Sequence, residues 1–262
     1  MYNFDFVKPA SLADAVSALG HEDAQPLSGG QTLLPSMKQR LNAPAVLVSL
    51  TGIAELKGVR RDGDTLLIGA ATTHAVVARE AAAHYPAVAD LAARIGDPAV
   101  RNRGTIGGSL ANNDPSACYP AAALASGATI VTNTRKIAAD DFFEGMFTTC
   151  LEPGEIIIEV RFPIPQSAAY AKFIQPASRF PLTASFVARY ADGVRVAITG
   201  ASESGVFRWP EAEDALTASF SAEAVKGLAA PDEGMIGDLH GTPEYRAHLC
   251  GVMTRRAVTA AQ

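Results

Sequence analysis

The first fifty residues alternate short apolar runs with helical patterns. Apolar runs predict strands at residues 4–7, 24–27 and 45–50. Between them, apolar positions at helical spacing predict one helix that begins after Ser11 and ends at Gly20, and another over residues 32–40. A strand–helix–strand–helix–strand order over so short a stretch is typical of a small parallel sheet.

The pattern changes near Gly52. Two apolar runs flank Asp62-Gly63-Asp64, which is a hairpin turn signal, so the sheet that follows is expected to be mostly antiparallel. Further strands are predicted at residues 56–61, 65–69, 128–132, 136–138 and 156–162. Helices are predicted at residues 72–80, 86–95 and 120–126.

From Tyr170 onward the composition shifts again. Asp192-Gly193 predicts a hairpin between strands at residues 184–190 and 194–199. Three helices are expected at residues 210–217, 222–227 and 242–260. No cluster of site-like residues occurs here, so this part is interpreted as a packing and docking domain. The pattern as a whole predicts an α+β fold with domains at residues 1–54, 55–165 and 166–262.

Two glycine-rich stretches stand out from this pattern. Residues 101–120, RNRGTIGGSLANNDPSACYP, are too polar and rich in small residues to predict a buried helix, and residues 112–115 indicate a turn. Residues 105–109 are expected to offer successive backbone N–H groups, which form anion-binding concavities. We expect side-chain bulk at Gly30 or Gly107 to block that approach.

The other glycine-rich stretch runs over residues 27–38. Gly29-Gly30 follows an apolar run and precedes a predicted helix, where free N–H groups and the helix dipole favour phosphate. Neither stretch is a G-x-G-x-x-G or P-loop motif, and each alone is compatible with a tight turn. Together they suit a diphosphate held from two sides.

Charge and cysteine usage exclude several classes. The formal net charge of the 262-residue chain is −5 and no basic run exceeds two residues, so nucleic acid is not an expected partner. Cys118, Cys150 and Cys250 are scattered and include no C-x-x-C, which argues against a disulfide framework, a zinc ribbon or an iron–sulfur cluster.

Metal and membrane sites are also not expected. The five histidines show no metal-ligand spacing and are interpreted as surface or capping residues: His21, His74, His84, His240 and His248. There is neither a signal-peptide pattern nor an apolar run long enough to span a membrane, so a cytoplasmic location is expected.

The two glycine stretches, SGGQTLLPSMKQR and VRNRGTIGGSLANNDPSACYP, resemble the FAD-binding segments of the medium, flavin-carrying subunit of molybdenum hydroxylases. This family includes xanthine dehydrogenases and aerobic carbon monoxide dehydrogenases. The resemblance continues through residues 1–4, 68–70 and 151–157 and is strongest up to about Pro165. It implies a cradle for FAD made of two α/β subdomains, followed by a C-terminal domain of antiparallel strands and helices.

The resemblance implies a set of FAD contacts. The first stretch contributes Leu27, Ser28, Gly29, Gly30, Gln31, Thr32 and Leu33. The second contributes Thr105, Gly107, Gly108 and Ser109, flanked by Asn102 and Asn112. Six apolar or small residues align with positions that line the flavin or the adenine: Ile95, Gly96, Val100, Ala111, Ile156 and Ile157. Packing in the core or in a buried strand would explain these residues equally well.

Two further positions are implied to tune the flavin. Cys118 stands where many relatives have an Asp beside the flavin ring, so the flavin potential is expected to differ. Lys172 aligns with a lysine near the flavin, where a cation would stabilise the anionic reduced ring. The alternative for Cys118 is a small packing residue, and the alternative for Lys172 is an exposed lysine on a strand.

The function implied by the resemblance is electron transfer. Substrate would be oxidised on a large molybdopterin subunit, and electrons would pass through [2Fe-2S] clusters of a small iron–sulfur subunit to this FAD. The assembly would be a dimer of heterotrimers, and this chain would carry no catalytic residue or metal beyond the flavin. The alternatives are a stand-alone FAD-dependent reductase with the same cradle and a docking module whose glycine loops are only turns.

Overall fold

The computed structural model describes all residues from Met1 to Gln262 and confirms the α+β fold. Its strands form a three-stranded, a five-stranded and a four-stranded sheet and one small hairpin. The predicted strands occur in the predicted order, and the strands Phe143–Gly145, Thr148–Thr149, Ser167–Ile174 and Gly205–Arg208 are additional to them. The three larger sheets fall within the three expected domains, while the domain boundaries themselves stay a prediction. None of the helices combines the length and apolar character that crossing a membrane requires.

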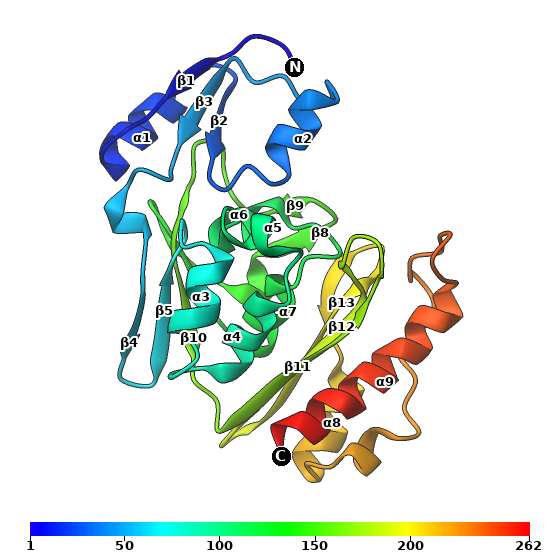
Figure 1. The fold of residues 1–262 in the computed structure, drawn as a ribbon. Helices are drawn as coiled ribbons and strands as arrows, with labels where there is room; N and C mark the ends of the chain where they lie inside the picture. Colours follow the sequence, from blue (N-terminus) through cyan, green and yellow to red (C-terminus); the bar gives the residue numbers. More distant parts are fainter.

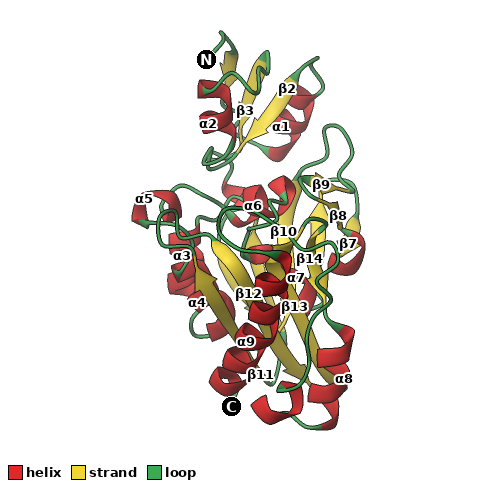
Figure 2. Cartoon of the chain, turned by 90° about the vertical axis from the view of Figure 1, so that its right-hand side faces the viewer, coloured by secondary structure: helices red, strands yellow, loops and turns green.

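The N-terminal unit stands apart at the top of Figure 2. Its parallel sheet has the order β1-β3-β2, which confirms the prediction for residues 1–54. The strands are β1 (Asp5–Val7), β2 (Ala24–Leu27) and β3 (Val46–Ser49), and the helices are α1 (Leu12–Leu19) and α2 (Leu33–Lys38). Ser11 caps α1 by accepting a hydrogen bond from the backbone N–H of Asp14.

The middle unit is an antiparallel sheet of order β4-β5-β10-β6-β7. Its strands are β4 (Val59–Asp62), β5 (Thr65–Gly69), β6 (Thr129–Thr132), β7 (Lys136–Ala138) and β10 (Ile157–Pro163). Its helices are α3 (His74–Glu80), α4 (Pro86–Ala93), α5 (Pro98–Arg101), α6 (Ile106–Asn112) and α7 (Tyr119–Ala125), with short 3₁₀ turns at Ala54–Leu56 and Ala139–Asp141. The hairpin of β8 (Phe143–Gly145) and β9 (Thr148–Thr149) was not predicted.

The C-terminal unit is a four-stranded antiparallel meander. It comprises β11 (Ser167–Ile174), β12 (Pro181–Tyr190), β13 (Gly193–Ser202) and β14 (Gly205–Arg208), then α8 (Pro210–Ala218), a 3₁₀ turn (Ala222–Val225) and α9 (Pro243–Ala261). In Figure 1, α3, α4 and α7 lie between the five-stranded and four-stranded sheets, and α9 covers the outer face of the latter. Both faces of β12 are therefore buried: Phe186 joins the inner core and Val187 the core under α9.

The structure corrects the interpretation of the second glycine-rich stretch. Residues 106–112, expected as loop, form the helix α6 with Ile106 and Leu110 fully buried. Thr105 caps it by accepting from the N–H of Gly108, and Asn113 ends it in the left-handed conformation at φ 40°. The small residues permit burial because the backbone at Gly107 packs directly on Ala70, where an added Cβ would lie 2.6 Å from the Ala70 Cβ.

Candidate functional site

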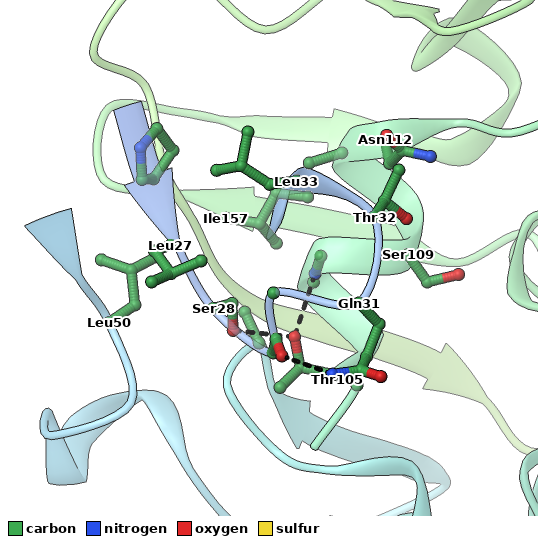
Figure 3. Close-up of a pocket in the computed structure, with 18 of the residues that line it drawn as sticks. Leu27, Ser28, Gln31, Thr32, Leu33, Leu50, Thr105, Ser109, Asn112 and Ile157 are labelled. Atoms are coloured by element: carbon green, nitrogen blue, oxygen red, sulfur yellow. Dashed lines mark hydrogen bonds between the residues drawn. The ribbon is translucent and has the colours of Figure 1, made fainter. Parts of the chain in front are cut away.

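A cavity of about 650 Å³ lies where the N-terminal unit meets the middle unit. Its walls include both glycine-rich stretches, the loop that precedes α7, and Phe180 in the connection just before β12. Figure 3 shows the stretch Leu27–Leu33 passing over the first turn of α6, with the side chains of Thr32, Ser109 and Asn112 close together.

The first glycine stretch presents a row of unpaired backbone donors. The N–H groups of Gly29, Gly30, Gln31, Thr32 and Leu33 have no acceptor within the chain. The row begins at Gly29, passes through Gly30 in the left-handed region at φ 69° and continues into the N-terminus of α2. Gln31 braces it by donating from Nε2 to the carbonyl oxygen of Gly29 at 3.1 Å. Successive free N–H groups of this kind suit a phosphate.

The second stretch does not supply the free N–H groups that the sequence predicts. Ile106 donates to Thr72 O at 3.2 Å, Gly107 to Ala70 O at 2.9 Å and Gly108 to Thr105 Oγ1 at 3.2 Å. The first two bonds fasten the first turn of α6 to the residues that follow β5, and the third is the N-cap of α6 itself. The second stretch therefore contributes packing and not N–H donors: its small residues let the first stretch approach closely.

The two stretches are locked together across 77 residues of sequence. Ser28 Oγ and Thr105 Oγ1 lie 2.8 Å apart and share a hydrogen bond. A Cβ atom at Gly29 would lie 2.3 Å from the Arg103 carbonyl oxygen, so glycine is needed there for loop-to-loop packing. One side of the cavity is thus formed by two segments that are distant in sequence and that are held together by the Ser28–Thr105 hydrogen bond.

No lysine or arginine lines the cavity. Of its two carboxylates, Glu155 is paired with Arg135 Nη2 at 2.9 Å, and this hydrogen-bonded guanidinium holds the pKa of Glu155 well below its usual range. Burial, together with the charge of Arg101, lowers the pKa of His74 from 6.5 to about 4, so its ring is neutral at pH 7. A bound anion here would be held by backbone dipoles.

The rest of the lining is largely apolar. In Figure 3, Leu27 lies between Leu50 and Ile157. Leu56, Val100 and Ile156 also contribute apolar side chains to the lining. Asn133 fixes the strand that carries the isoleucines by accepting from the N–H of Ile156 at 2.7 Å. An extended cavity with a row of N–H donors and apolar flanks fits a dinucleotide, whose diphosphate needs donors and whose ring systems need apolar contact.

Most of the residues expected at the site come together around this cavity. Those that line it are Leu27, Ser28, Gly29, Gly30, Gln31, Thr32, Leu33, Ile95, Val100, Thr105, Gly107, Gly108, Ser109, Ala111, Asn112, Ile156 and Ile157. Those that do not are Gly96, Asn102, Cys118 and Lys172.

Cys118 follows the lining residue Ala117 in the sequence, and its side chain packs against Lys172 outside the cavity lining. Lys172 Nζ donates to Arg94 O at 3.0 Å and lies 3.7 Å from Cys118 Sγ. Lys172 is only 9% exposed, so its interpretation as an exposed strand lysine is wrong.

Sequence reasoning missed several lining residues. His74, expected at the surface or as a cap, is 4% exposed, and its ring packs on Tyr119 with centroids 5.3 Å apart. Gly104 makes room for it, since a Cβ there would lie 2.6 Å from His74 Nε2. Ser116, Ala117 and Phe180 were also missed, because their positions depend on contacts with distant strands. No group of three or more His, Cys, Asp or Glu side chains could hold a metal ion.

The fold and the cavity are typical of a protein that binds a phosphate-containing cofactor, because a row of free N–H donors lies against the first turn of α6. Over residues 2–165 the chain matches the family described as the FAD binding domain in molybdopterin dehydrogenase. The chain belongs to this family of FAD-binding proteins of the molybdenum hydroxylases.

Similarity to individual relatives extends over the whole chain. It is 35% identical to the carbon monoxide dehydrogenase medium chain of Afipia carboxidovorans, over 99% of this chain and 97% of the relative. It is also 35% identical to the nicotine 6-hydroxylase medium subunit of Paenarthrobacter nicotinovorans, over 98% and 96% of the two chains. Its structure superposes on a chain of reconstituted CO dehydrogenase from Oligotropha carboxidovorans with a TM-score of 0.90 and 33% identity, over 99% and 98%.

Proposed function

We propose that this chain is the FAD-carrying electron-transfer subunit of a heteromeric molybdenum hydroxylase. In this complex a large molybdopterin subunit oxidises the substrate, and [2Fe-2S] clusters on a small subunit pass the electrons to the flavin site of this chain. An external acceptor then takes them up. We further propose a dimer of heterotrimers in the cytoplasm. The observation that carries the proposal is the row of free N–H donors in a cavity built from the two stretches that characterise the family.

The residues of this chain bind, orient and shield the cofactor. The N–H groups of residues 29–33 hold the diphosphate, and the hydroxyls of Thr32 and Ser109 supply further donors. Ile156, Ile157 and the leucines opposite them exclude water from the ring systems. FAD, when bound, supplies the one- and two-electron chemistry that no amino-acid side chain provides.

Cys118 and Lys172 are proposed to act from outside the cavity lining. Both are buried and lie 3.7 Å apart, so the ammonium group of Lys172 acts through a medium that screens charge weakly. A cation at this place favours the anionic, reduced form of a neighbouring flavin. A thiol at position 118 adds no fixed carboxylate charge to oppose that effect.

Affinity purification of the tagged chain from its native host tests this assignment. We expect a yellow preparation that contains FAD together with a molybdenum-containing chain and an iron–sulfur chain. The isolated chain should bind FAD but oxidise no substrate of the complex, because the oxidising centre lies on the partner. Substrate oxidation by the isolated, molybdenum-free chain would contradict the proposal and favour a stand-alone flavoenzyme.

A further inference from the structure

One wall of the cavity is a short segment without regular structure between α6 and α7. Asp114, Ser116 and Ala117 of this segment line the cavity. Inside the segment, the N–H of Ser116 donates to Asp114 Oδ1 and the N–H of Ala117 donates to Asp114 O, each at 2.8 Å. These bonds shape the turn locally, but they do not fix where the turn lies relative to the rest of the cavity.

The segment is held from behind by β13 of the C-terminal sheet. Thr199 Oγ1 lies 2.9 Å from Pro115 O and 2.7 Å from Ala117 O, in position to donate to either carbonyl. The N–H of the next residue, Gly200, also donates to Pro115 O at 2.8 Å. Thr199 is fully buried, and no other side-chain hydroxyl donates to these two carbonyls.

A distortion of β13 puts Thr199 and Gly200 in this position. The pairing of β13 with β14 changes register between Ile198 and Ser202, as expected for a bulge. Gly200 adopts φ 86°, and a Cβ there would lie 2.4 Å from Pro181 O. Only glycine fits this bulge, which turns one N–H and one hydroxyl of the sheet toward the cavity wall.

A buried arginine fixes the bulge from the other side. Arg246 of α9 is 1% exposed, and its Nη1 donates to Gly200 O and Leu182 O, each at 2.7 Å. Its Nη2 pairs with Asp238 Oδ2 at 2.8 Å. The bulge carbonyl is therefore anchored by a charge-assisted hydrogen bond, the stronger kind. A continuous set of bonds runs from α9 through Gly200 to the cavity wall.

We infer that Thr199 is a positioning residue for the cofactor, and that the Arg246–Gly200 bulge exists to hold it in place. The C-terminal unit thereby shapes the cavity although it contributes almost none of its lining. The inference rests on the proposed function, since it assumes that FAD occupies this cavity. Loss of the Thr199 hydroxyl leaves the 114–117 wall held from β13 only by the Gly200 N–H, and this looser wall weakens cofactor binding even where the fold survives.

The test uses the full chain with Thr199→Val, Thr199→Ser and Thr254→Val. Valine keeps the shape but removes the hydroxyl, whereas serine retains it. Thr254 of α9 is the matched control, because it is also fully buried and its hydroxyl donates to Ser185 Oγ at 3.0 Å, away from the wall. FAD affinity is measured on FAD-free protein by flavin fluorescence, and unfolding midpoints are recorded for each variant.

We expect Thr199→Val to raise the FAD dissociation constant about tenfold, because the segment loses the single hydroxyl proton that both carbonyls face. Thr199→Ser should stay within about twofold of wild type, and Thr254→Val should lose stability without losing affinity. An unchanged dissociation constant in Thr199→Val, or an equal rise in Thr254→Val, overturns this inference alone. A wild-type chain that binds no FAD overturns the proposed function with it.

Discussion

Gly108→Val is expected to abolish FAD binding while the chain remains folded. Gly108 lies on the cavity surface in the first turn of α6 and is exposed. A Cβ there would meet only Thr105 Oγ1 at 3.0 Å and Ser28 Cβ at 3.8 Å, so the added bulk extends into the space of the cofactor. Stability should fall by only about 1 kcal/mol, because the new side chain crowds the capping hydroxyl of Thr105 at 3.0 Å while valine has a slightly better helix propensity than glycine.

Gly107→Val is the informative comparison. Its Cβ would lie 2.6 Å from Ala70 Cβ and 2.8 Å from Ala70 O, so it enters the protein interior and not the cavity. We expect a loss of about 3 kcal/mol in unfolding free energy together with loss of FAD. The sequence-based reason for this variant, a blocked diphosphate, is wrong, and the same holds for Gly30, whose Cβ would meet Leu34 Cδ1 at 2.8 Å.

Bound FAD per chain and urea unfolding of the FAD-free protein separate the two variants. Gly108→Val should be colourless with a nearly normal unfolding midpoint, and Gly107→Val should be colourless with a strongly lowered one. Full flavin content in folded Gly108→Val would show that the cofactor does not lie against the first turn of α6.

The FAD-free chain is expected to lose stability on mild acidification because of His74. Its folded-state pKa of about 4 lies below the ordinary value of 6.5, since burial opposes the charged ring. The unfolded chain therefore binds more protons than the folded chain between these two pH values. Linkage then makes stability fall as pH is lowered through this window, by about 2.5 kcal/mol between pH 7.5 and pH 4.5.

His74→Gln removes this titrating group. The fall in unfolding free energy between pH 7.5 and pH 4.5 should therefore be about 2.5 kcal/mol smaller in His74→Gln than in the wild type. Denaturant unfolding at pH 7.5 and at pH 4.5 measures the unfolding free energy of the wild type, of His74→Gln and of the control His248→Gln. His248→Gln, on the exposed side of α9, is the control and should keep the wild-type pH dependence because His74 is still present. Identical pH dependence in wild type and His74→Gln would refute the assignment of a buried, neutral His74.

Much of the fold could be predicted because its elements have local signals. Strand β2 and strand β5 have the predicted bounds, since apolar runs beside turn residues define them. Strand β11 was missed because Ser167–Ile174 is rich in alanine and carries Lys172, whose burial depends on contacts to Arg94 and Cys118. A lysine in a strand gives no sign of a partner 78 residues away.

The two glycine stretches illustrate the limit for the site. Their composition correctly indicated close backbone approach, and most of the predicted lining residues meet at one cavity. Composition could not show which N–H groups remain free: those of residues 29–33 do, whereas Ile106 and Gly107 donate to Thr72 and Ala70. That distinction is a tertiary property, because the acceptors belong to the end of β5 and the turn after it.

The central claim is that this cavity binds FAD through backbone donors between the two stretches. Titration of the FAD-free, full-length chain with FAD and with FMN, followed by flavin fluorescence, tests it most directly. We expect one FAD per chain, with FMN bound at least about tenfold more weakly, since FMN lacks the second phosphate and the adenosine that the cavity accommodates. Absence of saturable FAD binding, or equal affinity for FMN, would contradict it.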